Sequence, residues 1–399
     1  MINVNEAWNL LLSHVIPLKE ESVALEQSLG RVLTNDLKAD RDYPPFDRVA
    51  MDGYALSYES WQSGQRKFIV QAMQTAGQKP TELGDEKHCI EIMTGSALPR
   101  LCDLVIRYED SRRDGDHVYF LEDLQLERYT NVHRKGIDCP AGRSFPDRLM
   151  TPPLVALAAS FGSHSLKVIR KPRISIIGTG DELVAINFKP LDYQIRASNI
   201  HAMRMAVESR GHEVLSSETI VDERDLIRTS VEKALESSDI LLLSGGVSAG
   251  KTDYIPEILK ACGIEEVFHK INQRPGKPLW FGQSKSGKTV FGLPGNPVST
   301  LICLYRYVLP YIEAAQGRKH IQRPMVKLVS PRPKNSALTF FQAVKISYGD
   351  DAVIRADAAL HNGSGDFASL SGTDGFVEIP GELEPNYNPK QTIFPFYSW

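Results

Sequence analysis

The feature that most constrains this chain is a regular alternation of apolar runs and helix-like segments between residues 173 and 318. Apolar runs at 174–178, 239–244 and 290–293 each lead into a glycine-containing turn, and segments with helical periodicity lie between them. Strands that alternate with helices of this length are typical of a parallel, doubly wound sheet. The sequence therefore predicts an α/β domain, and ligands of such domains bind at the carboxyl ends of the strands.

The flanking segments have a different character. A short amphipathic helix is predicted over residues 4–15, and a second helix is predicted to start near Thr151 and to end before Gly162. Short β-type runs separated by turn residues lie between these helices, and similar runs return from about residue 322. We therefore predict a multidomain α/β chain with four parts: a helical linker domain (1–43 with 145–172), a β-rich insert (44–144), the α/β domain (173–318) and a small, barrel-like β-domain (319–399).

Composition narrows the class of protein. Lysine and arginine number 46 against 49 aspartates and glutamates, so the formal net charge is −3, which argues against a nucleic-acid partner. The five cysteines show no C-x-x-C pair, as expected in a reducing compartment. We see no targeting segment, and the longest uncharged run, 289–305, contains Pro294 and Pro297, which argues against a membrane span. We expect a cytoplasmic protein.

One motif suggests a different function. Residues 245–252 read GGVSAGKT, a formal match to the phosphate-binding loop of ATPases, and they follow an apolar run. However, Pro256 would fall inside the helix that must follow, where it costs about 3 kcal/mol, and no apolar strand ends in a suitable second aspartate. An ATPase stays an alternative, and it predicts that Lys251→Ala abolishes ATP turnover. A run of small residues also binds phosphate through backbone N–H groups alone, or simply forms a tight turn.

Charged residues gather after the predicted strands. Carboxylates follow three of them, and a basic run lies within the sequence KINQRPGKP. Carboxylates beside cations and glycine turns suit a magnesium-bound phosphate together with a separate oxyanion. The carboxylates are Asp181, Glu182, Asp222 and Asp253, and the cations are Lys270, Arg274 and Lys277. Any one of these residues taken alone is more simply a solvated surface charge.

Taken together, these motifs resemble the MoeA family, which includes the E domains of gephyrin and of the plant molybdenum insertase. SGGVSAGKTDY, RPGKP and GLPGNPVS follow GTGDEL in the family's order. The N-terminal half agrees through PPFDRVAMDGYAL (44–56), MTGSALP (93–99) and NVHRKGIDCPAG (131–142). The resemblance covers nearly the whole chain.

The resemblance implies a molybdopterin-binding sheet domain and a homodimer. The active site would join the sheet domain of one subunit to the β-rich insert of the other. The implied activity is that of a molybdopterin molybdenumtransferase. Such an enzyme inserts molybdate into adenylylated molybdopterin, gives molybdenum cofactor and AMP, and depends on Mg²⁺.

The resemblance also assigns roles to residues of this chain. The catalytic candidates are Asp52, Thr94, Glu182, Asp222 and Asp253, with Glu182 and Asp253 as magnesium ligands. The candidates for binding substrate and oxyanion are Lys270, Arg274, Lys277, Pro294, Asn296, Pro297 and Ser299. The candidates for the phosphate loops are Thr179, Gly180, Asp181, Gly245, Gly246, Ser248 and Gly250.

The chain departs from the family pattern at several positions. Arg274 replaces a usual lysine, Ala197 replaces a usual acid, and the family's arginines are absent around residues 336–343. These departures leave open a second hypothesis, a non-catalytic paralogue that binds pterin or nucleotide as a carrier or scaffold. Tungstate in place of molybdate also fits the pattern.

Overall fold

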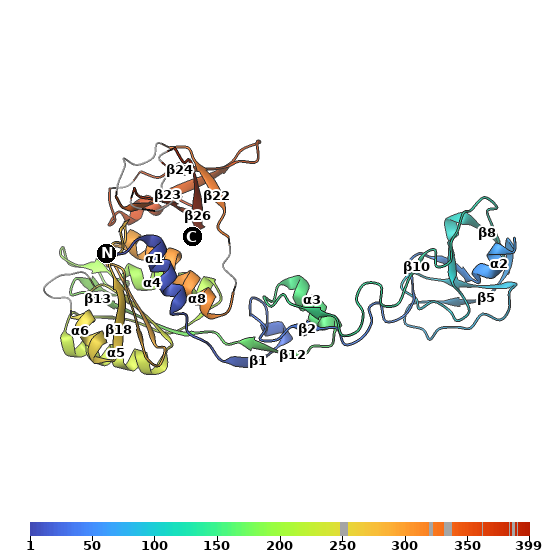
Figure 1. Ribbon diagram of the computed structural model, residues 1–399, viewed down its shortest axis with the longest axis horizontal. Helices are drawn as coiled ribbons and strands as arrows, with labels where there is room; N and C mark the ends of the chain where they lie inside the picture. Colours follow the sequence, from blue (N-terminus) through green and yellow to red (C-terminus); the bar gives the residue numbers. More distant parts are fainter. Residues whose placement is uncertain are drawn as a thin grey trace. The chain divides into compact units, whose positions relative to one another are not determined.

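The computed structural model describes residues 1–247, 254–318, 322–330, 337–360, 362–382, 384, 388 and 390–399. The chain forms two compact units (Figure 1). Unit 1 comprises Met1–Ser22, Gly30–Val32 and Lys167–Trp399, and unit 2 comprises Val23–Leu29 and Leu33–Leu166.

The core of unit 1 is a six-stranded sheet in the order β16-β13-β17-β21-β20-β18. Its strands are β13 (Arg173–Thr179), β16 (Glu213–Ile220), β17 (Ile240–Ser244), β18 (Ile264–His269), β20 (Trp280–Ser284) and β21 (Thr289–Leu293). The first four strands in this order are parallel to one another, which confirms the predicted doubly wound sheet. β20 runs antiparallel to both β21 and β18. The sequence did not reveal this edge, because β18 reads IEEVFH and lacks an apolar run.

Helices cover both faces of this sheet (Figure 1). They are α4 (Ser198–Ser209), α5 (Arg224–Ser237), α6 (Ile255–Ala261), α7 (Pro297–Cys303) and α8 (Leu309–Ala315). Ile240 and Leu242 of β17 pack with α4, α7 and α8, whereas Leu241 and Leu243 pack with α5 and α6. Since successive side chains of a strand point to opposite faces, a strand buried on both faces reads as an unbroken apolar run.

The helical segment after β21 is not α-helical throughout, because a π-helical stretch at Leu304–Val308 lies between α7 and α8. Pro310 lies in the first turn of α8. Because proline has no backbone N–H, it cannot make the α-helical hydrogen bond to the preceding turn, so a local change of helix type is expected just before it.

The N-terminal helix α1 (Val4–Ser13) belongs to unit 1. The sequence had grouped residues 1–43 with 145–172, but Val4, Ala7 and Leu11 are buried in the same core as the sheet. The apolar face of α1 is therefore covered by the α/β part of the chain. The four-part division otherwise stays a prediction.

The C-terminal strands of unit 1 close into a barrel. They are β22 (Met325–Leu328), β23 (Thr339–Tyr348), β24 (Ile354–Ala358), β25 (Gly375–Ile379) and β26 (Ile393–Ser398). The ring is closed because β25 pairs with both β26 and β23. The two-residue strand β19 (Gln273–Arg274) adds to β23, so the barrel sheet is continuous with a turn of the α/β part.

A buried ion pair also ties the barrel to the α/β part. Arg306 in the π-helical stretch donates to Glu378 of β25 at 2.6 Å, and Tyr397 donates to the same carboxylate at 2.8 Å. Burial opposes the charge of Arg306, but the Glu378 carboxylate outweighs it and raises the pKa of the guanidinium.

Unit 2 contains a second six-stranded sheet in the order β7-β4-β6-β5-β9-β8. Its strands are β4 (Gly53–Leu56), β5 (Lys67–Gln74), β6 (His88–Ile92), β7 (Leu104–Arg107), β8 (Ser111–Asp114) and β9 (His117–Phe120). These strands confirm the β-rich character that the sequence predicts between the two helices. The helix α3 (Pro152–Ser160) follows Thr151, as predicted.

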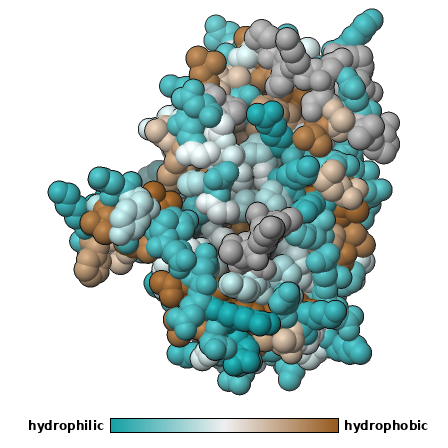
Figure 2. Space-filling view, turned by 90° about the vertical axis from the view of Figure 1, so that its left-hand side faces the viewer, coloured by the Kyte–Doolittle hydropathy of each residue, from teal (hydrophilic) through white to brown (hydrophobic). Residues whose placement is uncertain are grey.

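Short elements complete the fold. They are β1 (Glu20–Ala24), β2 (Leu37–Lys38), β3 (Arg48–Val49), α2 (Tyr58–Gln62), β10 (Val132–His133), β11 (Ser144–Phe145), β12 (Ser165–Ile169), β14 (Leu183–Val184) and β15 (Ile195–Arg196). The face of the molecule drawn in Figure 2 is hydrophilic at its rim and of intermediate hydropathy at its centre, with hydrophobic residues in small separate groups. Within the described ranges, no helix is long and apolar enough to cross a membrane.

A buried histidine makes the stability of unit 1 depend on pH. His212 is only 5% exposed, and neither ring nitrogen has a hydrogen-bond partner. Burial and repulsion by Arg318, Lys171 and Arg210 lower its pKa from the ordinary 6.5 to about 4. The unfolded chain therefore binds the proton more readily than the folded chain between these two pH values. The free energy of unfolding is therefore unaffected by protonation of His212 above pH 6.5. It falls by about 3 kcal/mol as the pH is lowered from 6.5 towards 4.

We expect His212→Gln, which cannot take up this proton, to flatten the dependence of the unfolding free energy on pH between 6.5 and 4. Denaturant titrations at a series of pH values measure this slope. The exposed His201 provides the matched control, because His201→Gln should keep the slope of the parent protein. An unchanged slope in His212→Gln would contradict the assignment.

Candidate active site

A cavity of about 1020 Å³ lies in unit 1, where β13, β17 and β21 end at the barrel. Residues after all three strands line it, together with the turn that follows β19 and one side of the barrel. Doubly wound sheets bind ligands at the carboxyl ends of their strands, and the volume of this cavity suits a ligand of the size of a nucleotide or larger.

Two glycine turns meet at the floor of the cavity. Thr179 ends β13 and Gly180 follows it, and Gly245 and Gly246 follow β17. Gly245 and Gly246 have φ values of +98° and +61°, and a Cβ on Gly245 would lie 2.3 Å from the carbonyl oxygen of Thr179. Only glycine fits there, so the two turns pack backbone against backbone. Such turns present N–H groups that bind phosphate.

This close approach predicts a specific cost. Gly245→Ala should destabilise the chain by roughly 1–2 kcal/mol for the left-handed backbone, with a further loss from the contact with Thr179. Gly211 is the matched control, since its φ is +77° but a Cβ there would meet nothing within 4 Å. Denaturant titration should show Gly211→Ala to be clearly the milder change. Equal losses in the two variants would refute the close packing of the two turns.

Three carboxylates lie beside these turns, with different surroundings. Thr179 donates its hydroxyl hydrogen to Asp222, and the Asp222 N–H donates to Asp181 at 3.0 Å. Asp181 therefore fixes the loop and is not among the residues that line the cavity. Glu182 does line it, and its exposed carboxylate has no hydrogen-bond or ion-pair partner within the described part of the chain.

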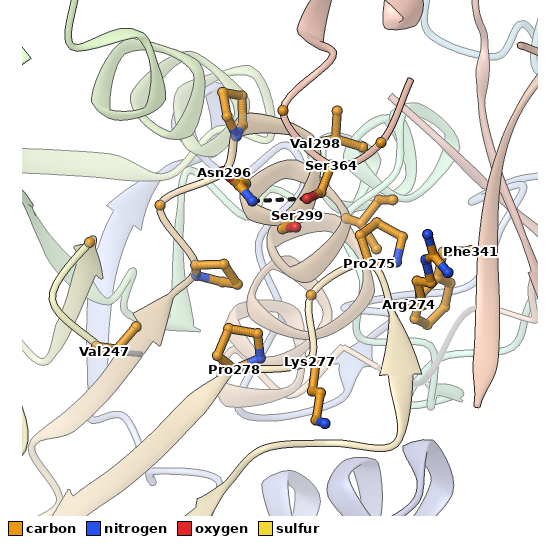
Figure 3. Close-up of a pocket in the computed structure, with 18 of the residues that line it drawn as sticks. Val247, Arg274, Pro275, Lys277, Pro278, Asn296, Val298, Ser299, Phe341 and Ser364 are labelled. Carbon is orange, nitrogen blue, oxygen red and sulfur yellow. Dashed lines mark hydrogen bonds between the residues drawn. The ribbon is translucent and has the colours of Figure 1, made fainter. Parts of the chain in front are cut away.

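Two cations line the cavity here, namely Arg274 at the end of β19 and Lys277 in the turn that follows. Both are exposed, and neither forms a hydrogen bond or an ion pair with any described residue. Their side chains point in different directions (Figure 3). The buried Gln273 holds this turn, because it donates to the carbonyl oxygen of Gly276 at 3.0 Å and accepts a hydrogen bond from Tyr307. Unpaired cations held by a rigid turn are available to an anion.

Lys270 is placed differently from the other two basic residues. Its backbone has φ +72°, its N–H donates to Leu279 at 3.0 Å, and it is not among the residues that line the cavity. The structure therefore brings two of the three predicted cations to the site.

The PGNP turn forms another wall, with Pro294, Asn296, Pro297 and Ser299 all lining the cavity. Asn296 donates its amide to the hydroxyl of Ser364 at 2.8 Å (Figure 3). The N–H of Val298 donates to the carbonyl oxygen of Ser364 at 3.2 Å. Two hydrogen bonds thus attach a loop of the barrel to the start of α7.

The sequence did not single out the barrel residues that line the cavity. They are Leu338, Phe340, Phe341, Ala343, Asn362, Gly363, Ser364, Gly365, Ser369 and Leu370. None of them is charged. The run NGSG at 362–365 was the available signal, because small polar residues between β-runs often form loops at binding sites.

Asp52 and Thr94 lie together in unit 2. Asp52 accepts the Thr94 N–H at 2.6 Å and the Thr94 hydroxyl at 2.8 Å. The backbone hydrogen bond, followed by the hydroxyl, lowers the pKa of the Asp52 carboxyl. They meet because β4 starts after Asp52 and pairs antiparallel with β6, which ends before Thr94. Ser248, Gly250 and Asp253 lie outside the described residues.

Comparison with known proteins identifies the family. Residues 2–162 match the MoeA N-terminal region, domains I and II, and residues 175–314 match a probable molybdopterin-binding domain. The chain is 38% identical over 403 residues to a molybdopterin molybdenumtransferase of Synechocystis sp., with both chains covered in full. The chain belongs to the MoeA family of molybdopterin molybdenumtransferases.

Other MoeA proteins agree. A molybdopterin molybdenumtransferase of Staphylococcus aureus is 29% identical over 388 residues, covering 95% of this chain and 92% of the relative. The crystal structure of a molybdopterin biosynthesis MoeA protein from Pyrococcus horikoshii has a TM-score of 0.82 at 25% identity, with both chains covered in full. The resemblance read from the motifs and the predicted fold class are thereby confirmed.

Proposed function

We propose that this MoeA-family enzyme inserts molybdate into adenylylated molybdopterin and releases molybdenum cofactor and AMP. The observation that carries the proposal is the pair of unpaired cations, Arg274 and Lys277, in a cavity that also contains two glycine turns. Molybdate is a tetrahedral dianion. Each of these cations can contact such an anion without first breaking an ion pair.

The nucleotide end of the substrate is assigned to the glycine turns. The turns after β13 and β17 present their backbone N–H groups to a phosphate, while Gly245 and Gly246 leave no side chain in its way. A pocket of this size accommodates the nucleotide and the pterin together with the oxyanion.

Magnesium fits the donors on this edge of the sheet. Mg²⁺ prefers carboxylate and phosphate oxygens and uses only one or two carboxylates of the protein. Glu182 has an unpaired carboxylate in the cavity, and we assign Asp253 as the second ligand from the motif alone. When bound, the ion would neutralise charge on the phosphate that leaves as AMP.

The role proposed for Asp52 and Thr94 needs a second copy of the chain. Neither residue lines the cavity of unit 1. In a homodimer, Asp52 and Thr94 of one subunit would complete the active site of the other subunit. The dimer would act in the cytoplasm. The lowered pKa keeps Asp52 ionised, as expected of a residue that stabilises positive charge.

The activity is tested with purified protein, adenylylated molybdopterin, molybdate and Mg²⁺. We expect molybdate-dependent formation of molybdenum cofactor with release of one AMP for each cofactor formed. A MoeA homologue that is active under the same conditions is the positive control. No turnover beside an active control would refute the proposal.

The uncharged barrel wall favours one second candidate, a protein that binds the nucleotide-linked pterin without catalysis. Calorimetry separates the two. The scaffold predicts binding of adenylylated molybdopterin with no AMP release when molybdate and Mg²⁺ are added, whereas the enzyme predicts that the heat of turnover follows the heat of binding.

A further inference from the structure

Buried polar groups without hydrogen-bond partners gather near the amino ends of the parallel strands of unit 1, away from the cavity. Seven buried side-chain nitrogen or oxygen atoms among the described residues lack any hydrogen-bond partner. One belongs to Ser60 of unit 2. The other six are Nε of Arg31, Arg318 and Arg323, both ring nitrogens of His212, and Oε1 of Gln316.

Hydrogen bonds and an ion pair bring most of these side chains together. Arg318 donates to the carbonyl oxygen of Gly30 at 2.6 Å, next to Arg31. The N–H of Arg318 also donates to the carbonyl oxygen of Glu313, whose carboxylate pairs with Arg210. His212 is affected by the charges of Arg318, Lys171 and Arg210, and Arg318 by those of Glu313, Arg210 and Arg31. The Arg323 guanidinium lies 5.0 Å from the centre of the Tyr397 ring, and after burial the charges of Tyr397, Glu313 and Arg210 have the largest effects on its pKa. Gln316 donates its N–H to the carbonyl oxygen of Glu313 at 3.2 Å. We name the set Arg31, Lys171, Arg210, His212, Gln316, Arg318 and Arg323 the basic cluster.

The topology separates the basic cluster from the candidate active site. Lys171 lies just before β13 and His212 just before β16, so both lie at the amino ends of these parallel strands. The cavity lies at the carboxyl ends. α4 and α8 also end at the basic cluster, immediately before Arg210 and Gln316.

Positive charge exceeds negative charge in the basic cluster. Arg31 is paired with Glu21, and Arg210 lies 3.5 Å from Glu313. Lys171 and Arg318 form no ion pair with the described residues, and burial lowers the pKa of both side chains. The carboxyl ends of two helices attract cations, which accounts for part of the charge. They do not account for N–H groups that remain without an acceptor.

We propose that the basic cluster is a binding site for a small tetrahedral oxyanion of the phosphate class. Unpaired buried donors are costly, and native proteins normally satisfy them with protein groups, ordered water or an ion. Four of the six atoms carry a hydrogen, namely the three arginine Nε atoms and one ring nitrogen of the neutral His212, so the missing partner must mainly accept hydrogen bonds. A multiply charged anion accepts them and also offsets the excess positive charge. The anion would join the start of two strands to the ends of two helices.

Thermal unfolding of the full-length protein tests the site, with inorganic phosphate compared with chloride at equal ionic strength. At phosphate well above its Kd, we expect Tm to rise by roughly 5 °C. Lys171→Gln should lose most of this rise, and its phosphate-free Tm should increase because one repelling charge is removed. A glycerol 3-phosphate arm distinguishes a phosphate ester from the free ion, since only an open site accepts the ester.

Two controls keep the test specific. Lys285→Gln changes a lysine that is 91% exposed and should keep the full rise. Lys277→Gln removes a cation of the candidate active site and should keep most of the rise. If phosphate has no effect beyond chloride, or if Lys171→Gln keeps the full rise, the basic cluster holds water and the proposal is wrong.

Discussion

Replacing Asp52 with alanine is expected to lower kcat for cofactor formation by about 10²-fold or more, while the unfolding free energy stays nearly unchanged. Asp52 accepts two hydrogen bonds from Thr94 beside the start of β4 in unit 2, and the proposed function assigns it to the active site of the partner subunit. Steady-state assays with saturating substrate measure the loss.

Asp85 offers a matched control in the same unit. Its carboxylate accepts hydrogen bonds from His88 at 2.6 Å and from the Lys87 N–H at 2.8 Å, and these bonds lower its pKa. Asp85 therefore resembles Asp52 electrostatically but lies outside the family motif. We expect Asp85→Ala to have the activity of the parent protein. An equal loss in both variants would show that the effect of Asp52 is not specific.

Mixing two inactive variants tests whether the site is shared. If Asp52 acts in the partner's site, a dimer of one Asp52→Ala subunit and one Glu182→Ala subunit contains one intact site. Random mixing should then restore about a quarter of the parent activity. If both residues act within one subunit, the mixture should stay inactive.

Replacing Lys277 with alanine is expected to lower kcat/KM for molybdate by about 10²- to 10³-fold. Lys277 is an exposed, unpaired cation of the cavity wall, and its removal leaves only Arg274 among the lining residues to balance the oxyanion. Lys277→Arg should recover part of the rate, because it keeps the charge but changes the geometry of binding.

Lys270 provides the discriminating comparison. The motif assigns Lys270 and Lys277 the same role, but only Lys277 lines the cavity. We expect Lys270→Ala to reduce kcat/KM by less than about tenfold, an effect smaller than that of losing a direct charge contact. If Lys270→Ala is as damaging as Lys277→Ala, the substrate must extend beyond the cavity described.

The fold could be predicted best from the sequence where a single physical requirement determines which residues are allowed at a position. β17 reads as an unbroken apolar run because both its faces are buried, so its place in a parallel sheet could be predicted. The glycine turns were visible for a related reason, since Gly245 tolerates no side chain against Thr179. These two features alone located the ligand-binding edge.

Features that depend on distant contacts could not be read from the sequence. β18 has exposed glutamates and forms a sheet edge only because β20 pairs with it. The packing of α1 on the α/β core depends on partners far along the chain, as does the bond between Asn296 and Ser364. The position of Lys270 outside the cavity could not be predicted for the same reason. A sequence motif gives the residue type but not the place of its side chain in the fold.

A crystal structure of the protein soaked with AMP, Mg²⁺ and molybdate tests the central claim most directly. We predict the AMP phosphate at the turns that contain Gly180 and Gly246, and molybdate beside Arg274 and Lys277 in the same cavity. Density for both ligands outside this cavity, with the cavity itself occupied only by solvent, would contradict the account.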